Sequence, residues 1–273
     1  MLKEEKPIVI AGPCMGESYE IMEKVYLSLS VLAKELDFDY YFKASFDKAN
    51  RSSAKSSRGP GLEQCVEWFG ELKKKYQCKI LTDIHSPEQV AKLAICDVLQ
   101  IPAFLCRQTD LLLAAVDSGK QVNVKKGQFV APPAMKSIVE KAGKQALARM
   151  WVTERGYSFG YGDLIVDMRG FYDLAKSGAK VIFDITHSTQ TPIAGADVSV
   201  TKARRDIAPL LARSAAATGY LDGFFLEVHP EPAKAQSDAD AQLDLDQAAL
   251  LLRQIIPLWR LSQKNRQTDL AFL

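Results

Sequence analysis

The sequence has little net charge, only 3 histidines and no long apolar run. Its 35 Lys and Arg residues nearly balance 33 Asp and Glu residues, which leaves a formal net charge of +2. That balance does not suggest a protein that binds nucleic acid or a membrane surface through its overall charge. No run of about 18 apolar residues occurs, and residues 1–7 are charged without the apolar core of a signal peptide. We therefore expect a cytoplasmic protein without nucleic-acid or membrane partners, in which any positive potential is local.

Paired cysteines are missing too. The five cysteines are odd in number and form no C-x-x-C pair, so reduced thiols fit better than a disulfide framework. A buried apolar thiol is the commoner role of a lone cytosolic cysteine. We assign that role to the four thiols other than Cys14.

The sequence does contain a regular alternation of short apolar runs and helical patterns. The apolar runs predict strands at residues 7–12, 39–44, 79–84, 97–101, 121–126, 150–154, 181–185 and 222–227. Helical periodicity predicts helices at residues 17–36, 62–76, 88–94, 109–115, 135–149, 170–177, 208–218 and 245–263. Eight βα units at roughly 30-residue intervals predict an α/β fold, a closed (β/α)8 TIM barrel forming one domain over residues 1–273. No G-x-G-x-x-G follows the first strand, which weakens the case for an open dinucleotide-binding sheet.

Polar side chains stand at the carboxyl end of every predicted strand. They are Cys14, Lys43, Asp83 with His85, Gln100, Lys125 with Lys126, Arg155, His187 and Glu227. Barrel enzymes build their active sites at that end, so Lys43, Lys125 and Arg155 indicate an anion-binding site. The loop 43–53 adds three serines, an amide and further cations, a set of donors that suits phosphate. For Lys126 we instead expect a strand cap whose amine reaches water.

A possible metal site combines residues that are distant in the sequence. Cys14, His187, Glu227 and Asp238 show no metal-finger spacing, but barrel closure makes the strands that precede them neighbours. Imidazole, thiolate and carboxylates suit a divalent metal such as Fe, Mn, Co or Zn. We expect His85 and His229 to be structural or supporting residues. We expect Glu17, Glu20 and Glu231 to be solvated carboxylates at helix starts.

Several long motifs are similar to those of one enzyme family. They are A-G-P-C (11–14), F-K-A-S-F-D-K-A-N-R-S-S (42–53), R-G-P-G-L-E (58–63), T-D-I-H (82–85), Q-I-P-A-F-L-C-R-Q-T-D (100–110), V-N-V-K-K-G-Q-F (122–129), T-E-R-G-Y-S-F-G-Y (153–161), F-D-I-T-H-S (183–188), E-V-H-P-E-P (227–232) and S-D-A (237–239). Over nearly its whole length the chain resembles the 3-deoxy-D-manno-octulosonate 8-phosphate synthases. These enzymes condense phosphoenolpyruvate with arabinose 5-phosphate and water in lipopolysaccharide sugar synthesis and release phosphate.

The resemblance implies roles for particular residues. The phosphoenolpyruvate set is Lys43, Ser45, Gln100, Ala103, Lys125 and Arg155. The pentose phosphate set is Lys48, Asn50, Arg51, Ser52 and Arg107, the last reaching across from a neighbouring subunit because the family forms homotetramers. Cys14 and the S-D-A motif are typical of the metal-dependent group, in which Cys14, His187, Glu227 and Asp238 hold the metal. The candidates for proton transfer and catalysis are Lys48, His187, Asp238 and Asp83.

Two positions depart from the pattern of that family. The loop 191–205 contains one glycine where the family usually has a Gly-rich segment, and Gly16 replaces a residue that is commonly apolar.

Three rival functions compete with the octulosonate synthase. The first is the sister synthase that uses erythrose 4-phosphate, which typically has K-P-R-T where residues 48–52 read K-A-N-R-S. The second is a Schiff-base aldolase using Lys43 or Lys125, and the third is a non-catalytic phosphosugar-binding barrel.

Overall fold

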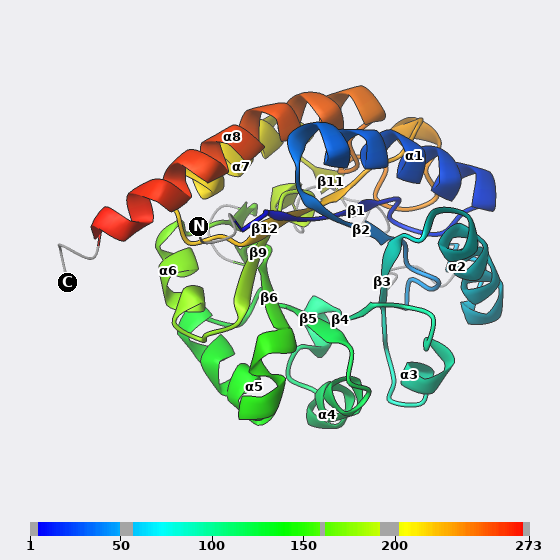
Figure 1. Cartoon of the computed structure of the whole chain (residues 1–273), viewed down its shortest axis with the longest axis horizontal. Coiled ribbons are helices and arrows are strands. Elements are labelled where there is room, and N and C mark those ends of the chain that lie inside the picture. Colours follow the sequence, from blue (N-terminus) through cyan, green and yellow to red (C-terminus); the bar gives the residue numbers. More distant parts are fainter. Residues whose placement is uncertain (1–4, 50–56, 159–161, 192–201, 270–273) are drawn as a thin grey trace.

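Eight parallel strands close into a barrel (Figure 1). The computed structural model describes residues 5–49, 57–158, 162–191 and 202–269. The barrel strands are β1 (Ile8–Gly12), β2 (Asp39–Lys43), β3 (Lys79–Asp83), β4 (Val98–Ile101), β5 (Gln121–Lys125), β6 (Met150–Glu154), β9 (Lys180–Asp184) and β12 (Gly223–Glu227). Their order around the barrel is β1-β12-β9-β6-β5-β4-β3-β2. The predicted (β/α)8 fold is confirmed, and each predicted strand end is correct to within one residue.

Helices surround the barrel and cover its outer face. They are α1 (Tyr19–Leu36), α2 (Leu62–Tyr76), α3 (Gln89–Lys92), α4 (Thr109–Asp117), α5 (Met135–Lys141), α6 (Arg169–Ala175), α7 (Ala208–Ala217) and α8 (Leu245–Asp269). Short 3-10 segments are η1 (Ala103–Leu105), η2 (Pro132–Ala134), η3 (Lys144–Arg149), η4 (His187–Thr189), η5 (Arg205–Ile207) and η6 (Pro232–Lys234). The first and last helices, α1 and α8, pack together along one flank of the barrel (Figure 1).

Three helix predictions need correction. The single helix expected at 135–149 is two pieces, because Gly143 takes a left-handed φ of 80° after α5, a conformation that ends helices. The α3 segment forms only one turn instead of spanning residues 88–94. Helix α8 continues past the predicted end at residue 263 and accommodates Pro257 inside it.

The barrel interior is divided into an apolar plug and a polar upper layer. Alternate strand residues point inward, and the plug consists of Ile8, Ile10, Tyr41, Leu81, Val98, Trp151, Ile182 and Phe225. The inward residues nearer the carboxyl ends are polar and include Lys43, Asp83, Lys125, Asp184 and Glu227, all at most 7% exposed. The plug closes the barrel from below, so the polar layer forms the floor of a site at the carboxyl ends of the strands.

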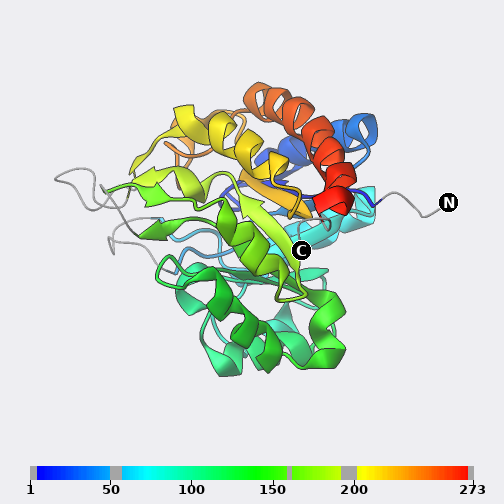
Figure 2. The same cartoon turned by 90° about the vertical axis from the view of Figure 1, so that its left-hand side faces the viewer.

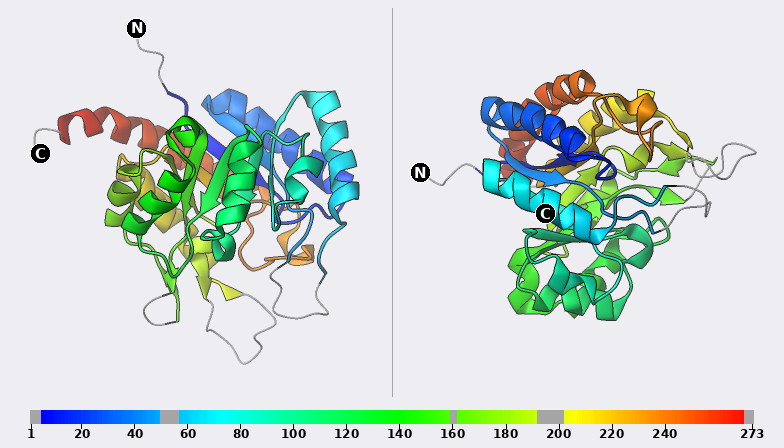
Figure 3. Two further views of the ribbon diagram at one scale, coloured as in Figure 1. Left: turned by 90° about the horizontal axis from the view of Figure 1, so that it is seen from below. Right: turned by 90° about the vertical axis from the view of Figure 1, so that its right-hand side faces the viewer.

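Two small hairpins extend the same end of the barrel. The pair β7 (Tyr157–Ser158) and β8 (Leu164–Ile165) follows β6, and the pair β10 (Gln190–Thr191) and β11 (Lys202–Ala203) follows β9. Figure 2 shows both hairpins on the side opposite to the N-terminal segment that enters β1. Figure 3 shows α1 and α2 side by side on another flank. Within the described ranges, no helix is both long and apolar enough to span a membrane.

Candidate active site

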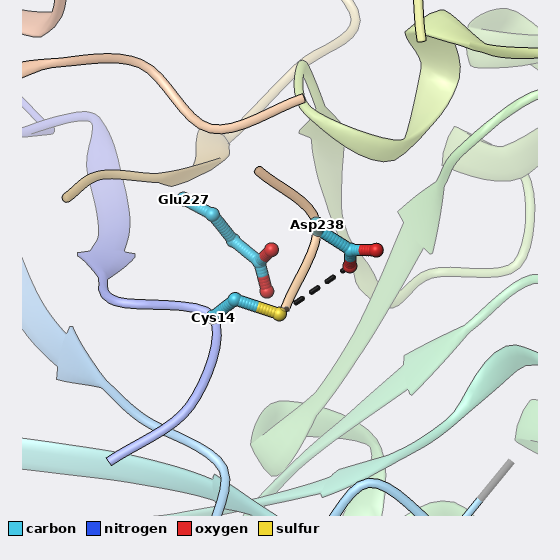
Figure 4. Close-up of side chains that lie close together, drawn as sticks. All are labelled: Cys14, Glu227 and Asp238. Carbon is cyan, nitrogen blue, oxygen red and sulfur yellow. Dashed lines mark hydrogen bonds between the residues drawn. The ribbon is translucent and has the colours of Figure 1, made fainter. Parts of the chain in front are cut away.

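A thiol and two carboxylates meet at the carboxyl ends of β1 and β12. Glu227 ends β12 and lies in register with Gly12 of the neighbouring strand β1, so Cys14, two residues further along the chain, reaches the same edge. One ligand atom from each of Cys14, Glu227 and Asp238 lies within 4.8 Å of the other two. Figure 4 shows the three side chains pointing toward one another. Three of the four predicted metal ligands therefore come together.

The loop after β12 delivers Asp238 to this group. Asp238 has a φ of 47°, a left-handed conformation that aspartate tolerates better than most residues. Its Oδ2 lies 3.3 Å from Cys14 Sγ, and the neighbouring Ser237 Oγ lies 3.0 Å from the same sulfur. Gln242 secures the arrangement, because its Oε1 accepts from Cys14 N at 3.0 Å while its Nε2 donates to Ser237 O at 2.8 Å.

His187 faces the thiol and the two carboxylates but is not one of the three residues whose ligand atoms lie within 4.8 Å of one another. Its Nε2 lies 3.6 Å from Asp238 Oδ2 and 3.8 Å from Glu227 Oε2. Its Nδ1 lies 2.9 Å from Asp184 Oδ2. Burial by itself would lower the pKa of His187, but the charge and hydrogen bond of Asp184 together with the charge of Glu227 raise that pKa above the ordinary value. The imidazole is therefore oriented with Nε2 toward the carboxylates, as a ligand held by a carboxylate behind it would be.

The donor set fits a divalent transition metal. Glu227 Oε2 is buried and, within the described part of the chain, has no hydrogen-bond partner, so it can coordinate an ion. Burial, together with the charges of Asp238 and Glu227, raises the pKa of the Cys14 thiol well above its usual range. A dication would offset that clustered negative charge and favour the thiolate. The combination of thiolate, imidazole and carboxylates suits Fe, Mn, Co or Zn.

Buried cations lie beside this group. Lys43 Nζ lies 2.5 Å from Glu227 Oε1 and donates to Cys14 O at 2.8 Å. Lys125 Nζ pairs with Asp184 Oδ2 at 2.7 Å. Both ammonium groups lie over the ring of Phe225, at 5.6 and 3.8 Å from its centroid. The two lysines therefore converge, as the anion-site prediction requires.

Arg155 is the third buried cation of the site. It is 5% exposed, and its Nη2 donates to His187 O at 3.2 Å and to the Gln190 side chain. Its Nε is buried without a hydrogen-bond partner among the described residues. Burial lowers the pKa of Arg155 from its usual value. A buried guanidinium with a spare donor is a natural partner for a carboxylate or phosphate oxygen.

Lys48 joins the site through a serine and an aspartate. Its Nζ donates to Ser45 Oγ at 2.9 Å, and the Ser45 hydroxyl donates to Asp83 Oδ2. Burial would lower the pKa of Lys48, but Cys14 and Glu227 raise it well above the ordinary value. Burial would likewise raise the pKa of Asp83, but Lys43 and Lys48 hold it below its usual range. Lys48 is therefore an ammonium and Asp83 a carboxylate near neutral pH.

The remaining predicted residues are only partly placed. Asn50, Arg51, Ser52 and the atypical loop at 192–201 lie outside the described residues. Ala103 is buried at the start of η1, two residues after the end of β4. Arg107 is exposed.

Comparison with known proteins decides the family. Residues 3–260 match the DAHP synthetase I family. The chain belongs to this family. The match spans the whole barrel, including every side chain described above.

Several curated proteins similar to this DAHP synthetase I family member carry the name 2-dehydro-3-deoxyphosphooctonate aldolase. The one from Wolinella succinogenes is 47% identical over 263 residues, covering 92% of this chain and 98% of its own. The one from Desulfatibacillum aliphaticivorans is 46% identical over 252 residues, covering 92% and 91%. The one from Brucella abortus strain S19 is 45% identical over 256 residues, covering 93% and 91%. The resemblance drawn from the motifs is confirmed.

Two predictions about individual side chains of this family member are wrong. Lys126 does not reach water: it is 0% exposed, donates to the carbonyls of Gly127, Val130 and Gly156 and lies 3.5 Å from Glu154 Oε1. The loop after β5 and the turn after β6 close over its head group.

Glu17 is not a solvated carboxylate either. Its side chain is 5% exposed, its Oε2 lies 3.8 Å from His229 Nε2, and its Oε1 accepts from Gln236 N at 2.9 Å. The loop after β12 covers it, which sequence position alone did not indicate. Glu20 and Glu231 are exposed, as expected.

Asp184 is a site residue that the sequence analysis missed. It is 0% exposed and joins Lys125 to His187, so it orients one cation and one ligand at once. A signal was present in F-D-I-T-H-S, because a single acidic residue directly follows the apolar residues 181–183 of the strand. A charged group in such a buried position needs a partner.

Proposed function

We propose that this chain condenses phosphoenolpyruvate with D-arabinose 5-phosphate and water, giving 3-deoxy-D-manno-octulosonate 8-phosphate and inorganic phosphate. The principal support is the convergence of Lys43, Lys125 and Arg155 beside the thiol–carboxylate group, in a chain similar to the curated aldolases along its whole barrel. Buried cations fix two polyanions side by side, which replaces a bimolecular encounter with an oriented one.

The reaction makes one carbon–carbon bond, makes one carbon–oxygen bond to the oxygen of water, and cleaves the carbon–oxygen bond to phosphate. The enol carbon of phosphoenolpyruvate attacks the sugar aldehyde, water adds to the adjacent carbon, and phosphate leaves with its bridging oxygen. In this proposal Lys125 and Arg155 hold the phosphate and carboxylate of phosphoenolpyruvate and stabilise charge on the departing phosphate. Lys48, kept protonated by its anionic surroundings, provides the proton for the aldehyde oxygen. Asp83, which is ionised near neutral pH, accepts a proton from the attacking water.

We place the chain in the metal-dependent group. Cys14, His187, Glu227 and Asp238 would hold the metal, which when bound supplies Lewis acidity toward water or the aldehyde. Asp184 and Gln242 orient these ligands from behind. Asn50, Arg51 and Ser52 complete the pentose phosphate set in this proposal.

We also propose that residues 1–273 form one catalytic domain and assemble as a cytoplasmic homotetramer. Exposed Arg107 would then reach the sugar phosphate bound to a neighbouring subunit. Mixing inactive Arg107→Ala subunits with inactive Lys48→Met subunits tests this, because sharing across the interface restores part of the activity. Gel filtration with light scattering gives the subunit number.

Phosphate release tests the function directly. The purified protein is incubated with phosphoenolpyruvate and either arabinose 5-phosphate or erythrose 4-phosphate, with and without a chelator. We expect release with the five-carbon sugar, little with the four-carbon sugar, and loss of activity on chelation. Release with erythrose 4-phosphate alone would identify the sister synthase instead.

Two further outcomes would point to the other rival functions. A non-catalytic barrel would bind the sugar phosphate in a calorimeter and release no phosphate with either sugar. A Schiff-base aldolase would be trapped as a covalent adduct on Lys43 or Lys125 by borohydride, and we expect no adduct.

A further inference from the structure

A line of hydrogen bonds crosses the barrel interior next to the proposed site. Thr153 Oγ1 donates to Asn123 Oδ1 at 2.7 Å, and Asn123 Nδ2 donates to Gln100 Oε1 at 2.8 Å. Gln100 Nε2 then donates to Asp83 Oδ1 at 2.5 Å. These side chains come from β6, β5, β4 and β3, which are successive neighbours in the barrel, and none is more than 7% exposed.

The charge of Asp83 sets the direction of the whole line. An ionised carboxylate only accepts hydrogen bonds, so Gln100 has to present its NH2 group to Asp83. Its oxygen then faces Asn123, which has to present its own NH2 group in turn. The Asn123 oxygen is left needing a donor, and the Thr153 hydroxyl supplies it. Each of these buried hydrogen bonds forms only when all four side chains keep this orientation.

The other carboxylate oxygen of Asp83 leads to Lys48. Asp83 Oδ2 accepts the Ser45 hydroxyl, and Ser45 Oγ accepts from Lys48 Nζ at 2.9 Å. Because the Ser45 proton is used by Asp83, a lone pair of Ser45 points to Lys48. The position of the Lys48 ammonium therefore depends on the rotation of the Asp83 carboxylate. That rotation is fixed by the line of hydrogen bonds that begins at Thr153 on β6.

We propose that Asn123 and Thr153 are positioning residues for Lys48, acting through Gln100, Asp83 and Ser45. Both are 0% exposed, so neither touches a substrate, and neither has a part in the roles assigned above. This inference rests on the proposed function, in which Lys48 is the proton donor.

Removal of the Thr153 hydroxyl should disturb the far end of the line. In Thr153→Val the shape of the side chain is kept, but Asn123 Oδ1 loses its donor in a buried position. If Asn123 and Gln100 turn to compensate, the Gln100 oxygen faces the Asp83 carboxylate and repels it. Asp83 then rotates, and Ser45 and Lys48 lose their alignment.

The test compares three variants in the phosphate-release assay with both substrates varied. For Thr153→Val we expect kcat to fall about tenfold, a fraction of what a proton donor contributes, with both KM values changed less than about twofold. Thr153→Ser keeps the hydroxyl and should restore kcat. Thr82→Val is the matched control, since Thr82 is equally buried on the opposite face of β3 and donates to Ala44 O at 2.7 Å, outside the line. It should match the loss in melting temperature without the loss in kcat.

Three results would overturn the inference: an unchanged kcat in Thr153→Val, an equal loss in Thr82→Val, or no recovery in Thr153→Ser. Thr153→Ala serves the same test if the valine variant does not fold. If the native protein itself releases no phosphate, the proposed function fails separately. Crystal structures of the native and Thr153→Val proteins then decide the inference by whether the Asp83 carboxylate and Lys48 amine have moved.

Discussion

The buried ion pair between Lys126 and Glu154 allows a sharp stability prediction. Both side chains are 0% exposed, and their charged atoms lie 3.5 Å apart. Lys126→Met preserves most of the side-chain volume but leaves the carboxylate of Glu154 buried without its cation. Breaking a buried pair in this way costs about 3–5 kcal/mol, and for a chain of this size that lowers the melting temperature by roughly 6–20 °C.

A double variant distinguishes the cost of leaving Glu154 as an unpaired buried charge from the cost of losing the hydrogen bonds of Lys126. In Lys126→Met/Glu154→Gln no charge remains, and the Gln oxygen still accepts from Gly156 N, which donates to Glu154 Oε1 at 2.6 Å in the native protein. The remaining cost should be about 1–3 kcal/mol, the penalty for unmade buried hydrogen bonds. The double variant should therefore be more stable than the single variant.

The assay is thermal unfolding at fixed protein and metal concentration, because binding and assembly shift the apparent stability. Lys136→Met is the control: Lys136 pairs with Glu140 at 3.9 Å with both side chains more than 60% exposed, so its loss should cost less than about 1 kcal/mol. If Lys126→Met costs no more stability than this control, Lys126 does not stabilise the buried carboxylate of Glu154 and the prediction is wrong. If the double variant is no more stable than the single one, the carbonyl hydrogen bonds of Lys126 carry the effect instead.

Three further predictions concern the site. Cys14→Ser should lose metal, measured by elemental analysis, and most activity; full activity in a metal-free preparation would contradict metal dependence. Lys48→Met should reduce kcat by about 10²–10⁴, the range for a general acid, and a kcat close to native would remove Lys48 from catalysis. Because the folded-state pKa of Asp83 lies below its unfolded value of about 3.9, its contribution to stability is complete above that pH and is lost as pH falls further. The destabilisation caused by Asp83→Asn should therefore be constant near neutrality and shrink in acid unfolding experiments; a penalty that grows on acidification would contradict the assignment.

The strands of the barrel could be predicted because their signals are local. Each strand is a short apolar run bounded by a polar residue, and in a closed parallel barrel all those polar ends lie on one edge. Cys14 and Glu227 could thus be brought together from the sequence although they are 213 positions apart in the numbering. The prediction failed at Gly143, whose left-handed backbone divides the helix expected at 135–149, because a glycine within a helical pattern can either be tolerated or end the helix.

The sequence by itself determined the strands, the edge where chemistry gathers and the residue types available there. Only the tertiary structure decided which polar side chains are covered and which partner each one takes. Lys125 and Lys126 are adjacent and chemically alike, yet one pairs with Asp184 in the site and the other with Glu154 beneath two loops. Successive strand residues point to opposite faces, and the burial of each depends on segments distant in the chain. The same dependence hid Asp184 and the line from Thr153 to Asp83, since hydrogen-bond partners across a barrel are set by three-dimensional neighbours and not by sequence distance.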